Sequence, residues 1–137
     1  MTLSVGLVLY RLGPAGPEVL IGHMGGPFFA HRHEGGWTFP KGLAEDGESP
    51  LEVAEREFTE EMGSAPPAGD SFDLGIAKAS GKTVHLLARE GDFDADAAVS
   101  NTFELEWPRG SGVMQTFPEI DRAAWVTLDD AETLLAK

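Results

Sequence analysis

The sequence predicts an α+β domain made of several strands and two helices. Two runs rich in Val, Leu and Ile flank a Gly- and Pro-containing turn, which is typical of paired strands. A capped helical segment occupies the middle of the chain, and more strand-like runs and a short amphipathic helix follow it. Because 137 residues is a usual length for one domain, we expect residues 1–137 to form a single domain.

The first two strands are expected at residues 4–11 and 18–24, on either side of the turn at residues 13–17. The first is so continuously apolar that we expect it to be buried on both faces. Residues 25–47 are rich in glycine and also contain four aromatic residues, so they predict an irregular loop with short extended pieces.

The segment Ser49-Pro50-Leu51-Glu52 predicts the start of a central helix, because it supplies an N-cap serine, a first-turn proline and the glutamate of a capping box. Gly63 is the expected stop. An apolar stripe at helical spacing is expected to face the core. It consists of Leu51, Ala54, Phe58 and Met62.

The second half of the chain predicts mostly strands. Residues 72–78 and 83–90 are typical of a hairpin, and residues 101–107 alternate in a way that predicts another strand of the same sheet. A short strand is expected at residues 123–126. Thr127 then caps a last amphipathic helix, whose apolar residues include Leu134 and Leu135.

Composition limits the classes of function. Ten Lys and Arg against 23 Asp and Glu give a net charge of −13, which disfavours polymeric nucleic acid and anionic membrane as partners. The chain has no cysteine, so a metal ion would need oxygen or imidazole ligands. No secretory signal or membrane-spanning run is evident, and we expect a cytoplasmic protein of undetermined oligomeric state.

The most informative segment runs from Gly42 to Ser64. It reads Gly-Leu-Ala-Glu-Asp-Gly-Glu-Ser-Pro-Leu-Glu-Val-Ala-Glu-Arg-Glu-Phe-Thr-Glu-Glu-Met-Gly-Ser and resembles the Nudix box. The residues in register with the box are Gly42, Glu48, Arg56, Glu57, Phe58, Glu60, Glu61 and Gly63, and only Ser64 departs from it. Seven fixed letters match by chance at roughly one in 10⁸ positions, and the glutamate enrichment does not make chance a sufficient explanation.

Glutamate spacing gives the box a chemical meaning. Glu57, Glu60 and Glu61 stand at i, i+3 and i+4 of a helix, where their carboxylates can share a hard divalent cation, Mg²⁺ or alternatively Mn²⁺. Arg56 can pair with Glu60 or with a loop carboxylate, and the resemblance implies Glu48. Gly42 and Gly63 are expected to be structural. The alternative without a metal site is a solvated acidic helix face.

The resemblance implies a Nudix fold, an α/β/α sandwich with a mixed β-sheet, and it extends over nearly the whole chain. The sequence is similar to bacterial proteins described as predicted nucleoside triphosphate pyrophosphohydrolases. It therefore implies Mg²⁺-dependent hydrolysis of a diphosphate linkage, by attack of water on phosphorus, in nucleoside triphosphates or dinucleoside polyphosphates. The alternatives are an ADP-ribose or nucleotide-sugar pyrophosphatase and a nucleotide-binding regulator without turnover.

Residues outside the glutamate helix complete the expected site. Lys41 is a candidate phosphate ligand, or else a solvated loop cation, and Trp37 is either part of the core or a platform for a base. Arg32 is a candidate for the polyphosphate tail. Its neighbours His31 and His33 are expected to be exposed, as paired loop histidines usually are, and the alternative is that they titrate near neutrality or ligate a metal ion.

Two acidic residues precede the strand at 123–126, where many Nudix relatives carry an acidic metal ligand or general base. Glu119 is the first choice for this catalytic role and Asp121 the second, with surface carboxylates as the alternative. His23 and His85 fall in expected strands and are expected to be structural. Residues 77–81 lack the proline of ADP-ribose pyrophosphatases and the tyrosine of many dinucleoside polyphosphate hydrolases, so they carry neither subtype signature.

Overall fold

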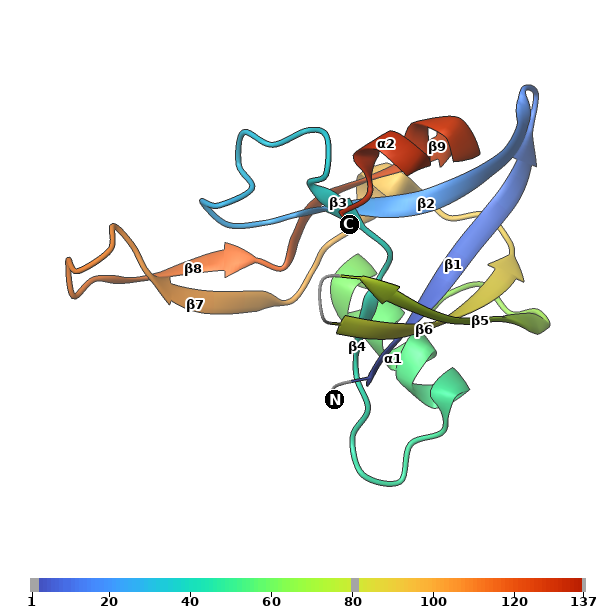
Figure 1. Ribbon diagram of the computed structural model, residues 1–137, viewed down its shortest axis with the longest axis horizontal. Coiled ribbons are helices and arrows are strands. Elements are labelled where there is room, and N and C mark those ends of the chain that lie inside the picture. Colours follow the sequence, from blue (N-terminus) through green and yellow to red (C-terminus); the bar gives the residue numbers. More distant parts are fainter. Residues whose placement is uncertain (1–2, 80–81, 137) are drawn as a thin grey trace.

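A mixed seven-stranded sheet is the centre of the computed structural model, which describes residues 3–79 and 82–136 (Figure 1). Its path runs β3-β2-β1-β6-β5, with β4 paired to β1 and β9 paired to β2. Among the described strands of this sheet, β1 and β6 pair in parallel, and the other pairs are antiparallel. The strands are β1 (Leu3–Gly13), β2 (Gly16–Met24), β3 (Trp37–Thr38), β4 (Lys41–Leu43), β5 (Ser71–Ala79), β6 (Lys82–Glu90) and β9 (Ile120–Thr127).

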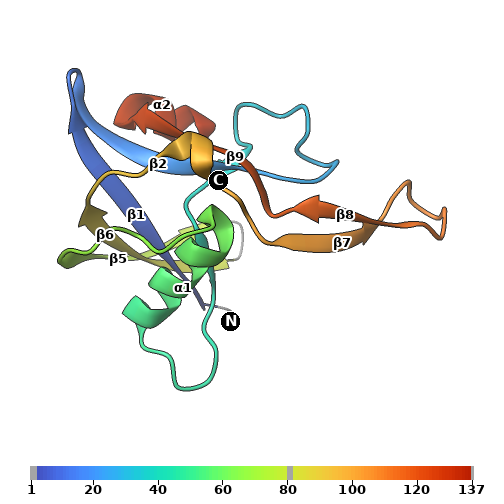
Figure 2. The same ribbon diagram turned by 180° about the vertical axis from the view of Figure 1, so that it is seen from behind.

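Helices cover both faces of this sheet, as the alternation of side chains along β1 shows. Leu7 and Leu9 pack toward α1 (Pro50–Met62), whereas Val8 packs toward α2 (Leu128–Leu134). Figures 1 and 2 show the two helices on opposite sides of the strands. The expected burial of the first strand on both faces is therefore confirmed. Of the expected hairpin turn and the subtype positions, Ser80 and Gly81 lie outside the described residues.

Helix α1 begins and ends where the sequence predicts. Ser49 accepts a hydrogen bond from the backbone of Glu52, whose side chain accepts one in return, and Gly63 closes the helix with φ of +88°. The expected apolar stripe was partly wrong, because Leu51 is 39% exposed. The buried face lies further round the helix, where it includes Val53 and also the carboxyl-bearing Glu61.

The strand expected at residues 101–107 does not extend the main sheet. It forms β7 (Thr102–Glu106), which pairs only with β8 (Met114–Pro118) in a separate two-stranded sheet, here called the arm. Phe103 of the arm packs against the backbone at Gly26 rather than against a sheet edge. The loop after β2 thus provides the packing partner for this apolar side chain. The arm projects from the molecule (Figure 2).

The short 3₁₀ helix η1 (Ala95–Ala97) connects β6 to the arm, and Asp94 caps it. Helix α2 has Thr127 as its N-cap, as predicted, and buries Leu134. No helix within residues 3–79 and 82–136 has the length and apolar character needed to cross a membrane.

Candidate active site

Residues from five parts of the chain line a cavity of about 300 Å³ beside α1. Helix α1 supplies two glutamates, β4 supplies a lysine and a glycine, and the end of β2 and the start of β9 close the cavity near the base of the arm. The lining residues are Met24, Thr38, Lys41, Gly42, Glu57, Glu61, Asn101, Glu119 and Ile120. Four of the residues expected from sequence to be functional side chains, and one box glycine, therefore meet here.

Arg56 anchors the loop before α1. Its Nε and Nη2 donate to the two carboxylate oxygens of Glu48 at 2.7 and 2.9 Å, which is the pairing that the resemblance implied. Nη2 also donates to the carbonyl of Leu43 at 2.9 Å. The hydrogen bond and charge of Glu48 raise the pKa of Arg56, and the same contact lowers the pKa of Glu48. The guanidinium therefore fixes the path of the chain toward Gly42.

The same guanidinium also contacts two of the glutamates on the helix. Nη1 of Arg56 donates to Glu57 at 3.0 Å and to Glu60 at 3.2 Å. The side chain of Glu60 is 40% exposed, compared with 13% for Glu57. Glu60 consequently lies at the rim, and the cavity itself receives Glu57 and Glu61.

Glu57 and Glu61 form a crowded carboxyl pair within hydrogen-bonding reach of each other. Burial, followed by the charge of Glu57, raises the pKa of Glu61 to about 8. Burial and the charge of Glu60 raise the pKa of Glu57 as well. The backbone N–H of Lys41 donates to Glu61 Oε2 at 3.1 Å, so this carboxyl is held in place although its charge is poorly solvated.

This pair predicts how the metal-free protein responds to pH. Since folding raises the pKa of Glu61 from 4.5 to about 8, its contribution to stability is greatest below pH 4.5 and is lost as pH rises through 8. Glu61→Gln removes that charge and keeps an acceptor for the Lys41 amide. In EDTA, we expect its thermal midpoint to exceed that of the wild type at pH 8.5 and to match it near pH 4.5.

Thermal unfolding followed by circular dichroism across this pH range measures the effect. The matched control is Glu55→Gln, because Glu55 lies on another face of the same helix. This variant should show no such pH-dependent gain in the thermal midpoint. A Glu61→Gln midpoint that tracks the wild type at every pH would contradict the burial argument. Added Mg²⁺ should stabilise the wild type more than the variant.

Gly42 provides the space that the carboxylates need. A Cβ built at this position would overlap the carboxyl group of Glu57. The backbone of β4 therefore approaches Glu57 as closely as only glycine permits, and the box glycine acts on the position of a glutamate. By contrast, a Cβ at Gly63 would meet the carbonyl of Val99 at 2.6 Å, in the segment that leads to the arm.

These oxygen donors fit a hard divalent cation, because burial raises the pKa of both carboxyl groups and the charge of Glu57 raises the pKa of Glu61 further, so a positive ion between them would relieve the cost. In residues 3–79 and 82–136, no three acidic or histidine side chains converge as a complete metal-binding set. Glu60 is not among the residues that line the cavity, and it pairs with Arg56 at 3.2 Å.

Lys41 brings a positive charge to the lining of the cavity, in a chain that has few basic residues. Burial lowers the pKa of its ammonium group, while the nearby Glu61, Glu57 and Glu119 oppose that effect. The group is therefore a half-buried cation among carboxylates, a setting suited to an anionic phosphate that arrives with a metal ion.

Glu119 reaches the cavity from the junction between the arm and β9. Its backbone N–H donates to the carbonyl of Asn101 at 2.9 Å, and its carbonyl accepts from Gly25 at 2.9 Å. Asn101 in turn donates its backbone N–H to the carbonyl of Glu60 at 2.7 Å. This series of hydrogen bonds connects the end of α1 to Glu119. Asn101 carried no signal in the sequence, because its role depends on contacts with residues about 20 to 40 positions away.

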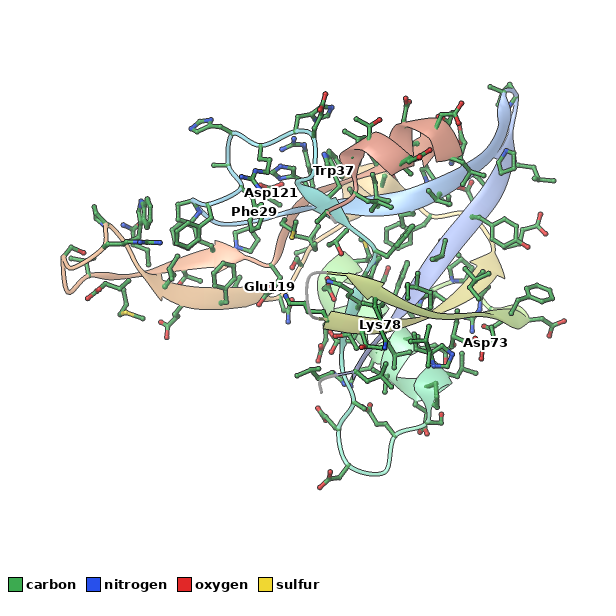
Figure 3. All side chains as sticks on the ribbon, in the orientation of Figure 1. Phe29, Trp37, Asp73, Lys78, Glu119 and Asp121 are labelled. Atoms are coloured by element: carbon green, nitrogen blue, oxygen red, sulfur yellow. The ribbon has the colours of Figure 1, made fainter. Side chains whose placement is uncertain are left out.

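Asp121, the second choice for the acidic role, is occupied elsewhere. Its carboxylate lies 2.8 Å from Nδ1 of the fully buried His23. Figure 3 shows Glu119 at the base of the arm and Asp121 near Trp37. The structure thus separates two carboxylates that lie only two residues apart in the chain.

The remaining candidates lie outside the cavity lining. Trp37 is 3% exposed and packs with the α2 core, which favours the core role that the sequence left open. Arg32 is exposed and lies over Phe29, with 5.8 Å between its Cζ and the ring centroid. His31 and His33 are exposed, as expected. His23 is part of the structural core.

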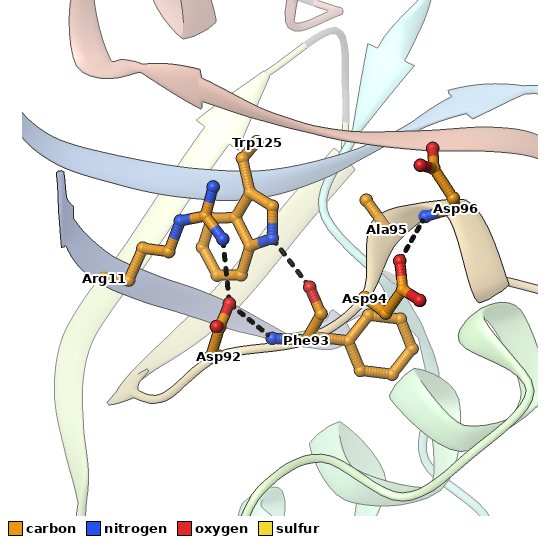
Figure 4. Close-up of a pocket in the computed structure, with 7 residues that line it drawn as sticks. All are labelled: Arg11, Asp92, Phe93, Asp94, Ala95, Asp96 and Trp125. Atoms are coloured by element: carbon orange, nitrogen blue, oxygen red, sulfur yellow. Dashed lines mark hydrogen bonds and ion pairs between the residues drawn. The ribbon is translucent and has the colours of Figure 1, made fainter.

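A larger cavity of about 490 Å³ lies elsewhere, beside η1 (Figure 4). Arg11 stacks over Trp125 at 4.2 Å and pairs with Asp92 at 2.8 Å, while Asp94 accepts from the backbone of Asp96. Arg11 and Asp92 are engaged in an ion pair and Asp94 in a helix cap, so the size of this cavity does not make it the better candidate site.

Comparisons with known proteins bear on the family and the fold of this chain. The family model described as the NUDIX domain matches residues 2–137. A comparison with curated proteins found no match. The three solved structures described next are all less than 25% identical to this chain, and they therefore bear on the fold alone.

Three solved structures illustrate the shared fold. The NUDIX domain of Shewanella oneidensis NrtR, complexed with ADP ribose, has a TM-score of 0.63 and 18% identity over 99% of this chain and 79% of its own. A Caenorhabditis elegans Ap4A hydrolase has a TM-score of 0.57 and 24% identity over 96% and 83%. The M. smegmatis Nudix hydrolase RenU has a TM-score of 0.57 and 21% identity over 98% and 76%.

Proposed function

This chain belongs to the Nudix family, and on that premise we propose that it hydrolyses a diphosphate linkage of a nucleotide with the help of a divalent metal ion. The observation that carries the proposal is the meeting of Glu57, Glu61, Glu119 and Lys41 in one cavity. A solvated acidic helix face would not bury Glu61 against β4. The buried carboxyl pair is costly in the metal-free protein, which supports a role in binding a cation.

Glu57 and Glu61 would hold the metal ion from within the cavity, and Glu60 would join them from the rim. Mg²⁺ is the first choice and Mn²⁺ the second, and either would neutralise phosphate charge and lower the pKa of a water molecule. Arg56 keeps Glu57 oriented, and the Lys41 ammonium would contact a phosphate oxygen. Glu119 would accept the proton of the attacking water, since it lines the same cavity from a different part of the chain.

The first substrate class is nucleoside triphosphates or dinucleoside polyphosphates. ADP-ribose is the alternative. Because an Ap4A hydrolase and a domain complexed with ADP ribose share the fold, the fold alone does not choose between these substrates, and both are to be tested. Diphosphoinositol phosphates rank low, because a chain of net charge −13 is poorly suited to such dense negative charge.

A panel of nucleoside triphosphates, diadenosine polyphosphates and ADP-ribose, assayed for product release with Mg²⁺, Mn²⁺ and EDTA, tests the proposal. Metal-dependent release of a nucleoside phosphate from any member supports it, and the second product identifies the bond that is cleaved. Binding of panel members without turnover at any metal concentration would instead support a nucleotide-binding regulator.

A further inference from the structure

His23 is a fully buried titratable residue that the proposed chemistry does not use. It lies near the end of β2, on the face covered by α2, with its ring edge-to-face against Trp37 at a centroid distance of 5.2 Å. Both ring nitrogens have partners: Nδ1 lies 2.8 Å from Asp121 Oδ1, and Nε2 lies 2.7 Å from the carbonyl oxygen of Arg32.

These contacts define the protons of the ring. A carbonyl only accepts, so Nε2–H donates to Arg32, and one further proton lies between Nδ1 and the carboxyl of Asp121. Loss of either partner would leave a polar ring atom unsatisfied in the core, which is costly. His23 therefore holds Asp121 on the α2 face of the sheet.

Asp121 is the extra residue of a β-bulge. In the pairing of β2 with β9, His23 lies opposite Arg122 and Met24 lies opposite Ile120, so Asp121 has no partner in the register. Regular alternation would direct Ile120 to the α2 face. Instead the side chain of Ile120 lies on the α1 face, 2.7 Å from where a Cβ of Gly22 would be, and it lines the cavity.

We propose that His23 and Asp121 form a positioning pair that fixes this bulge and thereby holds Glu119 at the cavity. The inference rests on the proposed function, in which Glu119 accepts a proton. Glu119 directly precedes the bulged strand, and its carbonyl accepts from Gly25, two residues beyond His23. The His23–Asp121 pair thus sets the register with which β9 begins its pairing with β2, and this register sets the position of the Glu119 carboxylate.

Asp121 is the residue to change, because removal of the buried His23 ring would also open a cavity in the core. Asp121→Ala removes the partner of Nδ1, whereas Asp121→Asn offers the ring a donor or an acceptor in the same place. In hydrogen exchange followed by NMR, we expect the Gly25 and Glu119 amides to exchange at least about tenfold faster in Asp121→Ala. They should stay near wild-type rates in Asp121→Asn.

Steady-state kinetics on the substrate found with the panel provide the second readout. We expect kcat to fall about tenfold or more in Asp121→Ala, with KM within about twofold. The reason is that the substitution displaces Glu119, the proposed general base, and leaves the phosphate contacts in place. Asp121→Asn should restore most of kcat. Unchanged exchange at Gly25 and Glu119 in Asp121→Ala, or an Asn variant as slow as the Ala variant, would overturn the positioning role.

Failure of the proposed function would look different. A wild-type protein without turnover on any substrate would refute the hydrolase while the exchange rates still decide whether the pair fixes the bulge. A loss of kcat in Asp121→Ala without any change in amide exchange would overturn the pair as a positioning device and leave the hydrolase intact.

Discussion

Replacement of Glu57 by Gln is expected to lower kcat/KM roughly a thousandfold while the protein remains folded. Gln keeps the size and an acceptor oxygen for Arg56, so the anchor of the loop survives. It removes one of the two cavity carboxylates proposed to hold the metal ion, and this charge cannot be replaced by an amide. Kinetics on the panel substrate across a Mg²⁺ titration, with circular dichroism to check the fold, measure the effect.

Glu55→Gln is the control for this experiment. Glu55 lies on the same helix but pairs with the buried Arg89 at 2.9 Å, away from the cavity, and Gln retains an acceptor for that contact. We expect near-wild-type kcat/KM for this variant. Equal activity of the Glu57 and Glu55 variants would refute the assignment of the metal site to the inner face of α1.

Gly42→Ala is expected to have the next largest effect, at about a hundredfold lower kcat/KM with weaker Mg²⁺ binding. The added methyl group would overlap the end of the Glu57 side chain. Because that end is flexible, we expect the carboxylate to move and the fold to survive. Titration of Mg²⁺ by calorimetry, together with kinetics, separates a displaced ligand from an unfolded protein.

Leu43→Ala provides the comparison, since Leu43 is the neighbouring residue and is 53% exposed. This variant should bind Mg²⁺ as the wild type does. If Gly42→Ala retains wild-type Mg²⁺ affinity and turnover, Glu57 does not need its position below β4, and the proposed metal site would have to move toward the rim at Glu60.

Local signals in the sequence predicted most of the strands, both α-helices, and the glutamates of α1 that are the candidate metal ligands. The caps at Ser49 and Gly63 act within one turn, so they can be recognised from neighbouring letters alone. The i, i+3, i+4 spacing of the glutamates likewise fixes which face of α1 they occupy. The box then identified the family, which the domain match confirms.

Tertiary contacts decided what local pattern could not. Alternation predicted a strand at residues 101–107 but not its partner, and the arm forms because β8 and the loop at Gly26 cover its apolar side. Burial of Trp37 in the α2 core and the reach of Asn101 to Glu60 also depend on residues far apart in the chain.

The choice between Glu119 and Asp121 shows the division most clearly. The sequence determined that an acidic residue precedes β9, and both candidates have the same chemistry. Only the folded chain separates them, because His23, almost a hundred residues away, pairs with Asp121 across a bulge. A bulge inverts the facing of every residue beyond it, and its position is set by a buried contact that no short stretch of sequence contains.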